Sequence, residues 1–219
     1  MARLVSLLGL LLMSSVPALA QVQRTHWGVA GGFTPKWETH ETFKQFFDAD
    51  SATFEGTDIR LGFVRGSIVG GDWGVSFVRR SVSDRSNVSR LTGECAGCGQ
   101  FFTATDARMT GVEVNKFVPF GTIKDRVQIG MNFAGGVAQL KGSVRAVSVS
   151  PAGTTAQDVE AKELFAPWGY QPNVVPLGKI EIAVAAILAP DLKLRVGGGF
   201  DFPGYNRINA SLVYLIGAR

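Results

Sequence analysis

The chain lacks an apolar run long enough to cross a membrane as a helix, and it has few residues suited to metal or covalent chemistry. Only 2 of its 219 residues are His and only 2 are Cys. Neither histidine has a finger-like spacing to the cysteines, so the sequence predicts no metal site and no cofactor.

Charge is also sparse and nearly balanced. The chain has 22 Lys and Arg against 18 Asp and Glu, which gives a formal net charge of +4. It has no basic cluster with interleaved aromatic residues, so nucleic acid is not an expected partner. A weakly basic surface of this kind favours at most contact with anionic lipid head groups.

The first feature that is present is a secretory leader. Residues 1–3 form a short basic start, residues 4–13 form an apolar core, and residues 17–20 end in a small-x-small pattern. A spanning helix needs about 20 apolar residues, and this core has roughly half that number. We therefore expect a signal peptide at residues 1–20, cleaved after Ala20, and a single mature domain at residues 21–219.

The two cysteines lie together in the glycine-rich segment 93–99. Cys95 and Cys98 have the spacing of a redox motif, but no helical pattern follows them. Because the leader directs the chain to an oxidising compartment, the spacing favours a local disulfide that closes a loop. The redox motif remains the alternative.

Eight segments have an apolar residue at every second position. They span approximately residues 25–37, 57–66, 72–82, 107–117, 126–140, 177–188, 192–202 and 207–217. Successive side chains of a strand point to opposite faces, so each segment has one bulky apolar face and one face of small or polar residues. The second face is rich in Gly and Ala, whereas a solvated face usually carries Lys, Glu and Thr. Small residues suit a crowded bore and apolar bulk suits lipid, so the pattern predicts an all-β, eight-stranded antiparallel up-and-down transmembrane β-barrel.

The connections alternate in length. Those at residues 67–71, 118–125 and 189–191 are short, and those at residues 38–56, 83–106 and 141–176 are long. Bacterial outer-membrane barrels have short periplasmic turns and longer outer loops. We therefore expect the cell outer membrane as the location, with both termini periplasmic. Within the last long connection, residues 148–157 are predicted to form a mobile loop, and residues 158–165 one or two helical turns.

Aromatic residues near the segment ends predict two interfacial rims. The periplasmic rim is expected to contain Trp27, Trp73 and Phe120, and the outer rim Trp37, Phe77, Phe133, Phe202 and Tyr205.

Charged residues fall on the face predicted to line the bore. They are Arg60, Glu113, Lys179, Glu181 and Arg195, with Lys193 and Asp201 nearer its ends. The bore of eight strands is just wide enough for side chains to fill, so buried charges there must pair with one another. This favours a structural plug of ion pairs over the alternative, a narrow polar pore whose selectivity these charges set.

In strand number, loop asymmetry and leader, the chain resembles the small eight-stranded outer-membrane β-barrel proteins. This class includes the membrane domain of outer membrane protein A and the OmpX-like and OmpW-like families. The segments 61–66 and 73–78 look like a hairpin of that class. The resemblance implies a non-enzymatic barrel with a structural, surface-binding or narrow-pore role. It also implies outer-membrane lipids and the barrel assembly machinery as partners.

Three other functions stay open. An outer-membrane lipid-modifying enzyme would need a site near His40, which has Glu38 and Glu41 as neighbours, since His26 lies at the periplasmic end of the first strand. A secreted, soluble lipocalin-like barrel would bind an apolar ligand and would place the apolar faces inside. A membrane barrel could instead bind an extracellular ligand through its long loops.

Overall fold

The barrel is built from eight long strands. The computed structural model describes residues 24–39, 54–84, 99–104, 106–124, 126–160, 174–202 and 204–218. The barrel strands are β1 (His26–Thr39), β2 (Phe54–Gly66), β3 (Asp72–Ser81), β6 (Arg108–Ile123), β7 (Val127–Lys141), β10 (Val174–Ala189), β11 (Leu192–Phe202) and β12 (Gly204–Leu215). Within these ranges, no helix has the length and hydropathy needed to cross a bilayer.

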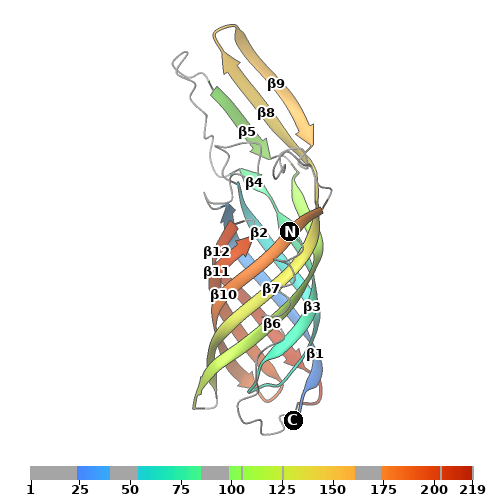
Figure 1. Cartoon of the computed structure of the whole chain (residues 1–219), viewed down its shortest axis with the longest axis vertical. Helices are drawn as coiled ribbons and strands as arrows, with labels where there is room; N and C mark the ends of the chain where they lie inside the picture. Colours follow the sequence, from blue (N-terminus) through green and yellow to red (C-terminus); the bar gives the residue numbers. More distant parts are fainter. Residues whose placement is uncertain are drawn as a thin grey trace, which may run out of the picture.

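Each barrel strand pairs antiparallel with the barrel strands next to it in the chain, and the first strand closes the sheet against the last (Figure 1). Gly28 of β1 lies opposite Leu215 of β12, while His26 lies opposite Gly66 of β2. Closure leaves no free sheet edge in the barrel wall. The predicted all-β, eight-stranded antiparallel up-and-down barrel is therefore confirmed.

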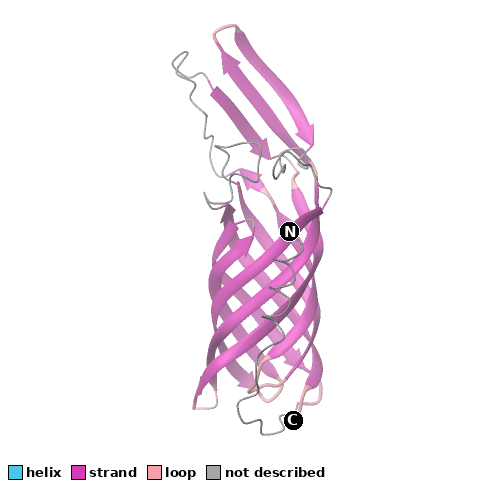
Figure 2. Ribbon diagram, in the orientation of Figure 1, coloured by secondary structure: helices cyan, strands magenta, loops and turns pink. Residues whose placement is uncertain are grey.

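The two ends of the barrel differ. Residues 67–71, 124–126 and 190–191 make the connections at one end, where β1 begins and β12 ends, and we call this the short-turn end. The predicted short connection 118–125 is shorter still, because β6 continues to Ile123. At the opposite, long-loop end, β4 (Ser83–Asp84) pairs with β2. Beyond it stands a sheet of β5 (Gly99–Ala104), β8 (Ser143–Ser150) and β9 (Gly153–Glu160), which we call the outer sheet (Figure 2).

The outer sheet corrects one prediction. Residues 148–157 were expected to form a loop and residues 158–165 helical turns, but residues 143–160 form the β8–β9 hairpin. Ser150 pairs with Gly153, whose φ of +132° suits glycine at the end of the turn. The described side chains of β9 are exposed, so no apolar alternation marked this strand in the sequence. The rest of the predicted helical segment, residues 161–165, lies outside the described residues.

The two faces of the barrel wall are oriented as predicted. Leu61 is 63% exposed and Ile182 67%, whereas Arg60 is 5% exposed and Glu181 1%. A lipocalin-like barrel with an apolar bore is therefore wrong for this chain. Glycine on the inner face serves close packing: a Cβ added at Gly62 would lie 2.5 Å from Ser76 Oγ.

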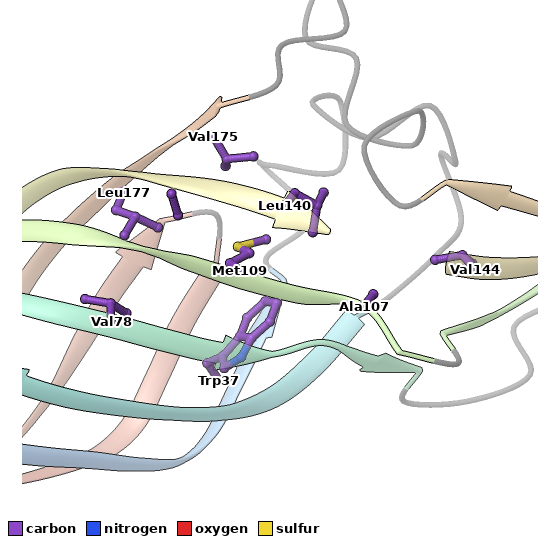
Figure 3. Packing of buried hydrophobic residues seen from close by; sticks show 9 residues of the cluster. Trp37, Val78, Ala107, Met109, Leu140, Val144, Val175 and Leu177 are labelled. Atoms are coloured by element: carbon purple, nitrogen blue, oxygen red, sulfur yellow. The ribbon is translucent and has the colours of Figure 1, made fainter. Parts of the chain in front are cut away.

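The predicted rim is correct at the short-turn end, whereas two residues of the predicted outer rim lie elsewhere. Trp27, Trp73 and Phe120 are exposed at the short-turn end. One misplaced residue is Phe133, which is half-buried in the middle of β7, opposite Lys116 of β6. The other is Trp37, which is fully buried. The registers of β1 shift between Phe33 and Trp37, around Pro35, so the side chain after the bulge turns inward. Trp37 packs in the outer apolar cluster, which consists of Trp37, Val78, Ala107, Met109, Ala138, Leu140, Val144, Val175 and Leu177 (Figure 3).

Candidate functional site

The bore of the barrel holds a balanced set of buried charges. Among the described residues these are five cations and five carboxylates: Arg60, Arg80, Lys179, Lys193 and Arg195, and Asp58, Asp72, Glu113, Glu181 and Asp201. A sixth buried carboxylate, Glu38, lies at the long-loop end and pairs with the exposed Lys36. A buried charge is costly unless an opposite charge and hydrogen bonds compensate it. Equal numbers of the two signs allow every charge in this bore to be compensated from within the barrel.

Toward the long-loop end, two arginines and two aspartates interlock. Arg60 Nη2 lies 2.7 Å from Asp58 Oδ2 and 2.8 Å from Asp201 Oδ2. Arg80 Nη2 lies 3.0 Å from Asp58 Oδ2 and also donates to Asp201 Oδ1. The four side chains come from β2, β3 and β11, so this outer charge cluster ties together strands on opposite sides of the bore.

A second group of charges continues the network at mid-barrel. Arg60 Nε lies 3.0 Å from Glu113 Oε1, and Lys179 Nζ lies 3.9 Å from the same oxygen and 3.7 Å from Glu181 Oε2. Glu181 also accepts hydrogen bonds from three asparagine amides at 2.8–3.1 Å: Asn132 of β7 and Asn206 and Asn209 of β12. These hydrogen bonds satisfy both oxygens of the carboxylate.

A separate inner charge cluster lies toward the short-turn end. Asp72 Oδ2 lies 2.7 Å from Lys193 Nζ and accepts a hydrogen bond of 2.6 Å from Arg195 Nη2. Lys193 also donates to the carbonyls of Ser67 and Gly70 in the β2–β3 turn, both at 3.2 Å. The Phe117 ring faces both cations, with Arg195 Cζ at 4.1 Å from its centroid. The cations therefore fasten β11 to the turn and to β6.

A polar cavity separates the inner charge cluster from the rest of the network. Its volume is about 30 Å³, and Arg60, Asp72, Glu113, Lys179 and Arg195 contribute to its lining. This volume corresponds to roughly one or two water molecules, because a water needs at least about 10–15 Å³ by this measure. Three of the lining residues have a buried side-chain atom without a hydrogen-bond partner among the described residues: Asp72 Oδ1, Asn132 Oδ1 and Arg195 Nε. A bridging water would satisfy such atoms, whereas a hydrated ion would not fit.

Apolar side chains lie at both ends of the bore. The outer apolar cluster covers the network at the long-loop end. Toward the short-turn end, Val64, Val213 and Leu215 form a second cluster with Ile68 and Ala218. The described part of the barrel is thus filled by apolar, ionic and again apolar layers.

The structure places all five predicted interior charges in the bore but does not join them in one network. Arg60, Glu113, Lys179 and Glu181 form a continuous chain of contacts, and Arg195 belongs to the inner charge cluster. Lys193 and Asp201 are fully enclosed as well.

Sequence reasoning missed three charges of the bore: Asp58, Asp72 and Arg80. Each lies an even number of residues from a position already assigned to the inner face. The two-residue period of a strand could therefore have placed all three in the bore.

Two other predicted features have no site around them in the described residues. Cys95, Cys98 and His40 lie outside those residues, while His26 is half-buried at the start of β1. Within the described ranges, no group of three or more His, Cys, Asp or Glu side chains is arranged to hold a metal ion.

Comparisons with known proteins add a likeness of fold. No protein-family model matches the chain, and no curated protein sequence does. Among solved structures, the chain is similar to Neisserial surface protein A, with 12% sequence identity and a TM-score of 0.43. The match covers 89% of this chain and 100% of that one. The fold assignment rests on the strand order and register of this barrel itself.

Proposed function

We propose that this protein is a non-enzymatic outer-membrane β-barrel with a closed bore, and that it presents the outer sheet and the long connections as a binding surface outside the cell. The observation that carries the proposal is the exposed apolar band around the barrel. Each of the eight strands contributes at least one bulky exposed side chain, among them Val29, Leu61, Val75, Val114, Ile129, Ile182, Val196 and Leu212.

A band of this kind is unsuited to water and suited to lipid. Soluble monomers rarely expose a contiguous apolar patch larger than a few hundred Å². Outer-membrane barrels present an apolar outer band about 25 Å tall around a polar interior. The inside of this barrel holds the charges and the outside holds the apolar bulk, which is the arrangement that lipid favours.

The filled bore supports a structural or surface-binding role over a pore. Ions would have to displace the contacts of Arg60 and Arg80 with two aspartates and then pass the outer apolar cluster. Eight strands enclose a bore that side chains fill, whereas the porins that conduct have about 16–18 strands. The narrow pore remains the second candidate, supported by the polar cavity at mid-barrel.

The short-turn end fits the periplasm, which would place both ends of the barrel chain there and the outer sheet outside. The described side chains of β9 are exposed, as expected for a structure that projects into water.

Two measurements on the full-length secreted chain test the location and the closed bore. The detergent-extracted protein should migrate differently on gels before and after boiling, as a barrel that resists detergent does. In planar bilayers it should show no sustained conductance. Release from cells in soluble form without detergent would refute the membrane location, and steady channels at low voltage would favour the pore.

Surface labelling tests the orientation. A short epitope inserted in the β8–β9 turn at residues 151–152 should bind antibody on intact cells. The same epitope in the β10–β11 turn at residues 190–191 should bind only after the outer membrane is permeabilised. The reverse result would invert the proposed orientation.

A further inference from the structure

The outward face of the barrel wall carries charges of one sign. Every described Asp and Glu side chain of the eight barrel strands is buried in the bore, except Glu38 and Glu55 at the long-loop end. The outward charged side chains are all cations: Lys36, Arg65, Arg79, Arg108, Lys116 and Lys141. The carboxylates of the wall are thus engaged inside, while the outer surface stays basic.

Two of these cations lie in a row with two tryptophans that begins near the short-turn end and reaches the middle of β6 at Lys116. Trp27 of β1 is opposite Arg65 of β2, Arg65 is opposite Trp73 of β3, and Trp73 is opposite Lys116 of β6. Residues paired in this way lie about 4.5–5.5 Å apart between Cβ atoms, so the four side chains form one continuous patch. We call this patch the basic aromatic row.

The row is held together by contacts between its own members. The Trp27 and Trp73 ring centroids lie 6.2 Å apart with an interplanar angle of 68°, an edge-to-face arrangement. The guanidinium carbon of Arg65 lies 5.5 Å from the Trp27 centroid. Both tryptophans stay about half exposed. The rings therefore position the guanidinium and leave its remaining hydrogen-bond donors accessible from outside.

Arg65 has no acidic partner among the described residues. No carboxylate of the described residues forms a salt bridge with it, and its contact is with an aromatic ring. An arginine or lysine on the lipid face is strongly unfavourable at mid-membrane and far less so near an interface. Arg65 is the penultimate residue of β2, one residue from Gly66 and the turn, so it lies where head groups are within reach.

We propose that the basic aromatic row binds the phosphate of an anionic glycerophospholipid in the leaflet at the short-turn end. The proposal rests on the membrane location proposed above. The planar guanidinium of Arg65 matches phosphate oxygens in bidentate geometry, and the longer Lys116 adds a second, flexible charge from the other side of Trp73. The indole N–H groups can donate to phosphate or ester oxygens, as tryptophans at membrane interfaces do.

The site is confined to one side of the barrel. The described outward side chains of β10, β11 and β12 include no Lys or Arg, because Lys179, Lys193 and Arg195 point into the bore. Nonspecific attraction to a charged membrane would need no such asymmetry. A localised site predicts that a single lipid position next to Trp27 and Trp73 is enriched in anionic lipid.

Tryptophan quenching by brominated lipids tests this enrichment locally. The full-length protein is refolded into vesicles of phosphatidylcholine and phosphatidylglycerol in which only one of the two lipids carries brominated acyl chains. At equal mole fractions, quenching should report a preference for phosphatidylglycerol of about five-fold or more, since each cation near an anionic surface contributes on that scale. The double variant Trp27→Phe, Trp73→Phe should remove the preferential part of the quenching.

Charge-matched variants separate the site from net charge. The pair Arg65→Gln, Lys116→Gln should lower the preference to about one. The pair Arg79→Gln, Arg108→Gln removes the same charge from exposed positions at the long-loop end and should leave the preference unchanged. If the double variant folds poorly, the single variant Arg65→Gln should also lower the preference. Inorganic phosphate added to the solution should not compete with the lipid for the row.

The outcomes distinguish the two proposals. Failure to insert, with no quenching by either lipid, would overturn the membrane location and the lipid site together. Insertion with equal quenching by both lipids would overturn the lipid site alone. Equal loss of the preference in the Arg65→Gln, Lys116→Gln variant and in the Arg79→Gln, Arg108→Gln variant would also overturn the lipid site alone. Loss of the preference in millimolar inorganic phosphate would assign the row to free phosphate and not to a lipid.

Discussion

Arg79 and Arg80 are consecutive residues of β3 in opposite surroundings. The Arg79 side chain is exposed on the outer face of the wall, while Arg80 is fully buried in the bore. Arg80 contacts Asp58 and Asp201, donates to the carbonyl of Phe202 at 3.3 Å and lies over the Trp37 ring. Arg79 has none of these contacts among the described residues.

This difference shows that a shift of one residue along a strand decides whether a side chain faces the bore or the outside of the barrel. On the inner face, a charged side chain is stable when an opposite charge pairs with it. On the outer face, a charged side chain costs little free energy only near a rim. The same residue type is therefore a structural element at one position and a surface group at the next.

The largest effect is expected from removing one buried cation. Arg80→Met leaves Asp58 and Asp201 with Arg60 as their shared arginine, and breaking a buried pair costs about 3–5 kcal/mol. Arg79→Met should change the free energy of unfolding by no more than about 0.5 kcal/mol. Urea unfolding of the refolded protein in vesicles, followed by tryptophan fluorescence, measures both. Equal effects for the two variants would contradict the assignment of the faces.

The next effect concerns depth on the outer face of β10. Ile182 is exposed in the middle of the strand, and Leu188 is exposed beside its short turn. If lipid surrounds the barrel, Ile182→Lys should cost about 2–4 kcal/mol and Leu188→Lys about 0–1 kcal/mol.

The same unfolding experiment in vesicles gives both values. A soluble barrel would show the opposite trend, since lysine at an exposed apolar position would be harmless at either depth. Similar small effects for the two lysines would therefore count against the membrane.

Two tryptophans of β1 allow a smaller and sharper comparison. Trp37 is buried and donates from Nε1 to the Ser81 carbonyl at 3.1 Å, whereas Trp27 is 57% exposed. Trp37→Phe leaves that carbonyl without its side-chain donor, which costs about 1–3 kcal/mol. Trp27→Phe keeps an aromatic ring at the rim and should cost less than about 0.5 kcal/mol. If Trp37 instead faced lipid, the two substitutions would have the same effect.

The contrast between the two tryptophans also marks where sequence reasoning reaches its limit. A period of two identifies all eight barrel strands, because lipid and a crowded bore select different residues on the two faces. It assigns Arg60 and Glu113 to the bore for the same reason. The period breaks at the bulge around Pro35, so Trp37 was placed on the wrong face.

Pairings across the bore are a second limit. Asp72 of β3 meets Arg195 of β11, residues 123 positions apart that are brought together by closure of the barrel. Charge type and parity place each of them inside but do not select the partner, because the partner depends on the stagger of all eight strands. The outer sheet is a third limit, since the described side chains of β9 are all exposed and give no alternation that could be read.

The smallest effect is expected in that outer sheet. Arg145 of β8 lies directly opposite Asp158 of β9, and both side chains are exposed. Asp158→Arg places like charges opposite each other, which destabilises a strand pair by about 0.2–1 kcal/mol. Amide hydrogen exchange in the β8–β9 hairpin should accelerate by about two- to five-fold, because opening of this hairpin exposes its own amides first.

Exchange in the barrel strands should not change, since β8 pairs with β5 and β9, β9 pairs with β8, and neither pairs with the barrel wall. The reversed pair, Arg145→Asp with Asp158→Arg, should restore the original rate by restoring opposite charges. Faster exchange in β6 or β7 of the single variant would mean that the outer sheet and the barrel open together. In that case the outer sheet would unfold as part of the barrel and not as a separate unit.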